Sequence, residues 1–165
     1  MNDARRRERV SNDVSTTGTY GACTYDMSMA LVMKAWVDVW KIPNAIPCEK
    51  YHTTILYSRK PLPESVLPKI DLKKNKMVFK PSGLDLFGEG KDRVLVMKLD
   101  APELITLHEK MIKLGATHDF PRYQPHVTIS YDLPEDFNWN TITPPPVFLI
   151  PDRIYFEPLD LDWDA

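Results

Sequence analysis

The chain has 165 residues, of which 43% are hydrophobic and 27% are charged, and its formal net charge is −2. This composition predicts one globular domain and excludes wholesale disorder. The charge argues against a long nucleic acid as partner, because such binding needs many Lys and Arg side chains against phosphates, but it allows a small nucleotide. Two cysteines are too few for a disulfide scaffold or a structural zinc site.

The first 17 residues contain several arginines and no apolar core of the kind that a secretory signal requires. We expect residues 1–17 to form a flexible tail and residues 18–165 to form a single domain. No apolar run reaches the length that crosses a bilayer, so we expect no membrane partner and a cytoplasmic location. The composition does not predict the oligomeric state.

The first half of the domain predicts a strand, a helix and a second strand. Residues 18–25 are β-prone, and Asp26 then offers an N-cap oxygen to a helix whose apolar residues recur at helical spacing. These are Met27, Leu31, Ala35 and Val39. Pro43 and Pro47 end this helix, and residues 51–57 are rich in β-branched and aromatic side chains, which predicts the next strand.

The second half repeats this order. A short strand at 77–80 and a Gly-rich turn at 83–90 precede a strand at 94–99. A helix is expected over 102–114, because Pro102 suits a first turn and Gly115 suits a helix end. The following strand occupies 126–131, and one or two closing strands are expected after a Pro-rich connector.

The strands predicted at 51–57 and 126–131 each contain a His-x-Thr sequence near their start, and we call them the motif strands. Side chains at i and i+2 of a strand point to the same face, so His52 lies beside Thr54 and His126 lies beside Thr128. If the two halves pack around a pseudo-two-fold axis, these pairs converge on one phosphate. The alternative interpretation is two core histidines with structural hydroxyl partners.

The paired residues suit cleavage of a phosphodiester next to a ribose. One imidazole can deprotonate the attacking 2′-hydroxyl and the other can protonate the departing 5′-oxygen, since imidazole titrates near neutral pH. The two threonine hydroxyls can donate hydrogen bonds to the non-bridging oxygens. Which histidine is the base is left open, and the spacing of acidic residues near Asp160, Asp162 and Asp164 gives no case for a metal site.

The motifs His52-Thr53-Thr54-Ile55 and His126-Val127-Thr128-Ile129 resemble those of the 2H phosphoesterase superfamily. The resemblance implies an α+β, bilobal fold with two antiparallel sheets, flanking helices and a pseudo-two-fold axis. It also implies a phosphodiesterase that needs no cofactor and no metal.

Within the superfamily, the chain looks most like the phage anti-CBASS nucleases, which degrade cyclic di- and trinucleotide signals such as cGAMP. This resemblance implies that aromatic side chains sandwich a base and that an acidic residue near the C-terminus contacts the ligand. Tyr20 matches the first role, Phe87 stands where the subfamily favours an indole, and Glu157 matches the acidic residue. The implied product is a linear nucleotide ending in a 2′,3′-cyclic phosphate.

Two rival functions stay open at this point. One is an RNA enzyme that acts on 2′,3′-cyclic phosphate ends or on 2′-5′ bonds, and the other is a non-catalytic sponge for cyclic nucleotides. Outside the motifs, Trp36 and Trp40 are expected to pack in the core. His108, which lies beside Glu109 and Lys110 on the second helix, is expected on the solvated surface.

Overall fold

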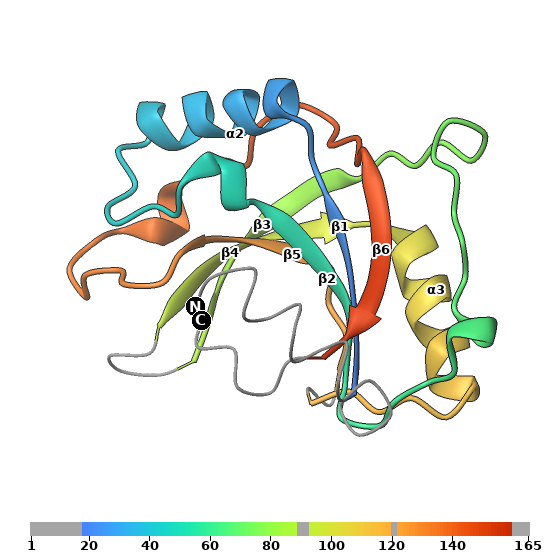
Figure 1. Cartoon of the computed structure of the whole chain (residues 1–165). Coiled ribbons are helices and arrows are strands. Elements are labelled where there is room, and N and C mark those ends of the chain that lie inside the picture. Colours follow the sequence, from blue (N-terminus) through green and yellow to red (C-terminus); the bar gives the residue numbers. More distant parts are fainter. Residues whose placement is uncertain (1–17, 89–92, 120–121, 160–165) are drawn as a thin grey trace.

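The computed structural model of the chain describes residues 18–88, 93–119 and 122–159 (Figure 1). The predicted tail and the acidic C-terminal end lie outside the described residues. The strands are β1 (Thr19–Thr24), β2 (His52–Ser58), β3 (Lys80–Phe87), β4 (Val94–Asp100), β5 (His126–Ser130) and β6 (Arg153–Pro158), and the helices are α2 (Met27–Val39) and α3 (Pro102–Lys113). Short 3₁₀ turns occur at Cys48–Lys50, Glu64–Val66 and Trp139–Thr141.

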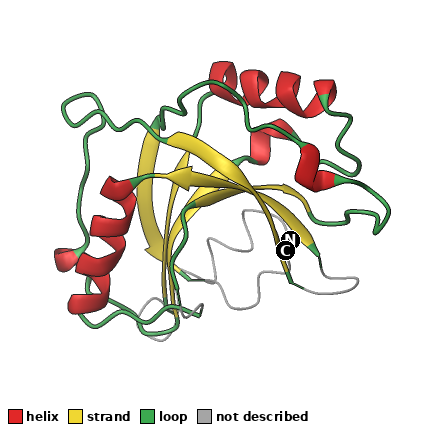
Figure 2. Ribbon diagram, turned by 180° about the vertical axis from the view of Figure 1, so that it is seen from behind, coloured by secondary structure: helices red, strands yellow, loops and turns green. Residues whose placement is uncertain are grey.

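Two three-stranded antiparallel sheets form the centre of the molecule, with strand orders β2-β1-β6 and β3-β4-β5. The two sheets converge where β2 contacts β5. Figure 2 shows the strands crossing at the centre of the molecule. The predicted α+β class with two antiparallel sheets and flanking helices is confirmed. Both motif strands are edge strands of their own sheets, which brings the two motifs to the junction between the sheets.

Each motif strand carries a β-bulge at the isoleucine that follows its threonine. In the first sheet Ala22 pairs with Thr54 while Gly21 pairs with Leu56, so Ile55 has no partner on β1. In the second sheet the pairing skips Ile129 in the same way. A bulge adds one residue to a strand and bends it locally. The matching positions of the two bulges give the two halves the same local shape.

The helices bury one face each. The buried side of α2 is formed by Ala30, Met33, Trp36 and Val37, and it belongs to one hydrophobic cluster with residues of β4 and β5. Helix α3 contacts β2, where Met111 packs with Leu56. Trp36 lies in the core as predicted, whereas the stripe that predicted the helix, with Met27 and Val39 at its ends, is exposed. Because α2 is apolar on several sides, its spacing alone did not identify the buried face.

Three expectations for the second half are wrong. The strand expected at 77–80 begins only at Lys80, the first residue of β3. The segment predicted as a turn at 83–90 is mostly strand, since β3 runs to Phe87 and pairs with β4 along its length. Pairing supplies the hydrogen bonds that outweigh the low strand preference of Gly83. His108 is buried, with 7% of its surface exposed, and not on the solvated surface. Its Nδ1 atom bonds to the carbonyl oxygen of Ile55, and this hydrogen bond replaces one that the exposed imidazole would make to water.

Candidate active site

The four motif side chains lie on the half-buried faces of β2 and β5. His52 and Thr54 alternate with the buried Thr53 on β2, and the same alternation occurs on β5. On β5, His126 and Thr128 are half-buried while Val127 between them is fully buried. This alternation follows from the two-residue period of a strand that has one face in the core.

Both imidazoles are held in the same way by the backbone before them. The Nδ1 atom of His52 lies 2.9 Å from the carbonyl oxygen of Lys50, and that of His126 lies 2.7 Å from the carbonyl oxygen of Gln124. A carbonyl oxygen only accepts, so each Nδ1 carries a proton and donates it. The Nε2 atom of each ring is therefore the one available for proton transfer to a ligand.

The electrostatics of the site favour the neutral form of His126. Burial lowers the pKa of His126 below its ordinary value of 6.5, and the charge of nearby His52 lowers it further, while the hydrogen bond to Gln124 opposes both. The Phe87 ring contributes to this burial, because its centroid lies 4.9 Å from that of the His126 ring in an edge-on arrangement. His126 is thus neutral at neutral pH, which is the form that accepts a proton.

Tyr20 lies beside the first motif. Its hydroxyl is 3.1 Å from the Thr54 hydroxyl, and its ring contacts the rings of Tyr57 and Tyr155 at centroid distances of 6.4 and 6.2 Å. Glu157 pairs directly with Tyr20 in the sheet register, so both side chains lie on the same face. Of the three predicted ligand residues, Tyr20 contacts the first motif and Phe87 contacts the second, while Glu157 shares the face of Tyr20 on the neighbouring strand β6.

The register also brings cationic side chains to the motif faces. Lys98 pairs directly with His126 across β4 and β5, and it forms no ion pair with any other described residue. On the first sheet, Thr24 pairs with both His52 and Arg153, so the arginine shares the face of the histidine two strands away. The Arg153 guanidinium lies over the Tyr155 ring, 5.1 Å from its centroid.

Sequence reasoning missed Lys98, Arg153, Tyr57 and Tyr155. No motif marks them. Lys98, Arg153 and Tyr155 reach the site through strand pairing, and Tyr57 lies on the motif face because the bulge at Ile55 changes the alternation of β2. The paired register would have been needed to find them. Among residues 18–88, 93–119 and 122–159, no three His, Cys, Asp or Glu side chains are grouped so that they could hold a metal ion.

Comparison with solved structures shows the same fold in LigT and in a second phosphoesterase. The structure of Escherichia coli LigT complexed with 3′-AMP matches 87% of this chain and 95% of its own, with a TM-score of 0.53 at 13% identity. A second structure, titled a phosphoesterase, matches 88% of this chain and 96% of its own, with a TM-score of 0.52 at 15% identity. The chain therefore has the fold of these phosphoesterases, as the paired motifs predicted.

Sequence comparison then identifies the family. The family model of the anti-CBASS protein Acb1 matches residues 17–165. The anti-CBASS protein Acb1 of Salmonella phage S16 is 39% identical over 149 residues, which cover 90% of this chain and 92% of the relative. The same protein of Acinetobacter phage Ac42 is 35% identical over 147 residues, or 88% and 93% of the two chains. The chain belongs to the Acb1 family of anti-CBASS proteins.

None of the helices within the described residues is long and apolar enough to cross a membrane.

Proposed function

We propose that the chain is a metal-independent phosphodiesterase that cleaves 3′-5′ bonds of cyclic di- and trinucleotide signals, so that a phage evades CBASS immunity of its host. The observation that carries this proposal is the matched geometry of the two motifs. Each presents an imidazole whose Nδ1 is anchored to the backbone and a threonine hydroxyl on the same face, and the two strands meet at the sheet junction.

In the proposed reaction the two histidines exchange protons with the substrate. Nε2 of His126 accepts the proton of the ribose 2′-hydroxyl as its oxygen forms a bond to phosphorus. The bond from phosphorus to the 5′-oxygen breaks, and that oxygen takes a proton from Nε2 of His52. The lowered pKa of His126 supports its role as the base, because it keeps the ring neutral. The product is a linear nucleotide with a 2′,3′-cyclic phosphate end.

Neutral and cationic donors stabilise the charge that builds up on the phosphoryl oxygens. Thr54 and Thr128 each donate one hydroxyl hydrogen bond, which is strongest when the acceptor oxygen is charged. Lys98 adds a positive charge from the position opposite His126. The donors come from both sheets, so the phosphate bridges the junction between them.

The substrate class follows from the remaining groups on the two motif faces. Tyr20 supplies a ring on which a base can stack, Phe87 supplies a second apolar surface at His126, and Glu157 supplies an acceptor for base or ribose donors. The net charge of −2 suits a compact ligand with few phosphates better than long RNA. The names of the phage relatives support the same biological role.

One experiment separates this function from its rivals. The purified protein is incubated with cyclic dinucleotides, cyclic trinucleotides and linear RNA bearing 2′-5′ bonds or 2′,3′-cyclic ends, with and without EDTA, and the products are separated by chromatography. We expect linear products from the cyclic substrates at an unchanged rate in EDTA. Cleavage of the RNA substrates alone would establish the RNA enzyme, binding without any cleavage would establish a sponge, and loss of activity in EDTA would show a metal requirement.

A further inference from the structure

The bulge in β2 is held from outside the sheet by two aromatic side chains. The Tyr123 hydroxyl donates to the carbonyl oxygen of Thr54 at 2.8 Å, and Nδ1 of His108 donates to the carbonyl oxygen of Ile55 at 2.7 Å. The two rings are stacked, with centroids 4.2 Å apart and planes inclined by 15°. The pair therefore acts as one unit on the backbone of the first motif.

The bulge in β5 is held differently. The carbonyl oxygen of Ile129 accepts a hydrogen bond from the backbone N–H of Ile46 at 2.8 Å. A backbone donor is common to every residue except proline, whereas the first bulge depends on two particular side chains. The two halves share the shape of the bulge and not the means of fixing it, so side-chain substitutions can disturb the first motif selectively.

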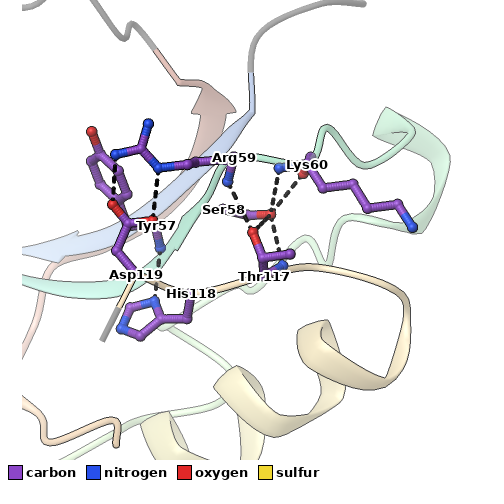
Figure 3. Close-up of polar contacts among 7 residues, drawn as sticks. All are labelled: Tyr57, Ser58, Arg59, Lys60, Thr117, His118 and Asp119. Atoms are coloured by element: carbon purple, nitrogen blue, oxygen red, sulfur yellow. Dashed lines mark hydrogen bonds and ion pairs between the residues drawn. The ribbon is translucent and has the colours of Figure 1, made fainter. Parts of the chain in front are cut away.

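The segment between α3 and β5 extends this contact along β2. His118 packs edge-on against His108, with centroids 4.6 Å apart, and its Nδ1 accepts the backbone N–H of Tyr57 at 3.2 Å. Figure 3 shows this bond together with the bonds between Arg59 and Asp119 at the end of the strand. Tyr123 and His118 thus bind β2 at Thr54 and Tyr57, and Asp119 binds Arg59, the residue that follows the strand.

We infer that His108 and Tyr123 are positioning residues that fix the Thr54 hydroxyl where it meets the phosphoryl group. The Thr54 carbonyl belongs to the same residue as that hydroxyl, so a shift of the bulge moves both. Placement matters because a displacement of about 1 Å near reacting groups can cost roughly 100-fold in rate. This inference rests on the proposed function, in which Thr54 contacts the reacting phosphate.

The sharpest test is Tyr123→Phe, which keeps the stacked ring and removes only the hydroxyl. We expect kcat to fall by roughly 3- to 10-fold, the loss of one ordinary hydrogen bond, with KM unchanged. In a Thr54→Val background, Tyr123→Phe should lower kcat no further, because the Thr54 hydroxyl that Tyr123 positions is absent. In a Thr128→Val background, Tyr123→Phe should still lower kcat by its full factor.

Two further variants separate positioning from a merely structural role. Tyr25→Phe removes another buried tyrosine hydroxyl bonded to β2, at 2.7 Å from Thr53 on the core side, and should lower Tm while kcat is retained. His108→Asn can still donate to the Ile55 carbonyl and should keep more of the rate than His108→Leu.

A wild-type kcat in Tyr123→Phe, or an equal loss in the Thr54→Val background, would overturn the positioning role while leaving the proposed function intact. Absence of cyclic-nucleotide cleavage by the wild-type protein would overturn both.

Discussion

The hydrogen bond between Tyr20 and Thr54 makes a quantitative prediction about catalysis. Their hydroxyl oxygens are 3.1 Å apart, so when the Thr54 hydroxyl donates to the phosphoryl oxygen, the Tyr20 hydroxyl can donate to Thr54. Hydrogen bonds linked in this way polarise the final donor, the Thr54 hydroxyl, and strengthen its bond to the charged phosphoryl oxygen. This geometry predicts for Tyr20 a role in the chemical step that is separate from the proposed base stacking by its ring.

The substitution Tyr20→Phe removes this bond and keeps the ring. A net contribution of about 0.5–1.5 kcal/mol for a neutral hydrogen bond predicts a fall in kcat of about 2- to 10-fold, with KM nearly unchanged. Thr54→Val removes a bond to a charged group, worth about 1.5–3 kcal/mol, and should lower kcat by about 10- to 150-fold. In the double variant, Tyr20→Phe should add almost nothing.

The assay is a double-mutant cycle on steady-state cleavage of a cyclic dinucleotide, with kcat and KM measured for the wild type, both single variants and the double variant. Tyr57→Phe is the matched control, since Tyr57 lies next to Tyr20 in the sheet and no hydrogen bond joins its hydroxyl to either motif threonine. Additive losses, or a rise in KM in place of a fall in kcat, would refute the relay between the two hydroxyls.

Further predictions concern charge and pH. Lys98→Met should lower kcat by roughly 10-fold or more, because it removes a charge beside the phosphate while the aliphatic stem is kept, and an unchanged kcat would exclude that role. The acid limb of the kcat/KM profile should lie below pH 6.5, and Phe87→Ala should shift it upward by exposing His126; a profile that stays in place would contradict this. Burial, and then the charge of His108, lowers the pKa of His118 to about 4, so folding stability should be full above pH 6.5 and fall as the pH drops from 6.5 to 4. His118→Asn keeps the acceptor, and its Tm should lose this part of the pH dependence; an identical dependence would contradict the assignment.

The sequence was sufficient to predict the strands and helices that carry strong local signals. The strands that begin at His52 and His126 combine β-branched residues with a motif, and the helices carry helical spacing and a proline or a cap at their start. The helix N-cap at Asp26 is present as expected, with its side chain accepting from the Met29 backbone N–H at 2.8 Å. These features depend on neighbours within a few residues, which is why they could be predicted.

The features that escaped prediction depend on long-range pairing. His108 lies among charged neighbours in sequence, yet it is buried because the bulge of β2 offers it a carbonyl oxygen 53 positions away. The glycine at position 83 suggested a turn, although β4 lies alongside and completes the hydrogen bonds of a strand. Lys98 became a candidate only when the register placed it opposite His126. No local pattern contains such information, because each partner is brought close by the fold.

The proposed mechanism depends most on two imidazoles acting on one phosphorus atom. Its direct test is single-turnover cleavage of a cyclic dinucleotide by His52→Ala and by His126→Ala, with binding measured separately. We predict that each substitution lowers the cleavage rate by about 10²- to 10⁴-fold while affinity stays within a few fold of the wild type. A near-normal rate in either variant would contradict the two-histidine mechanism.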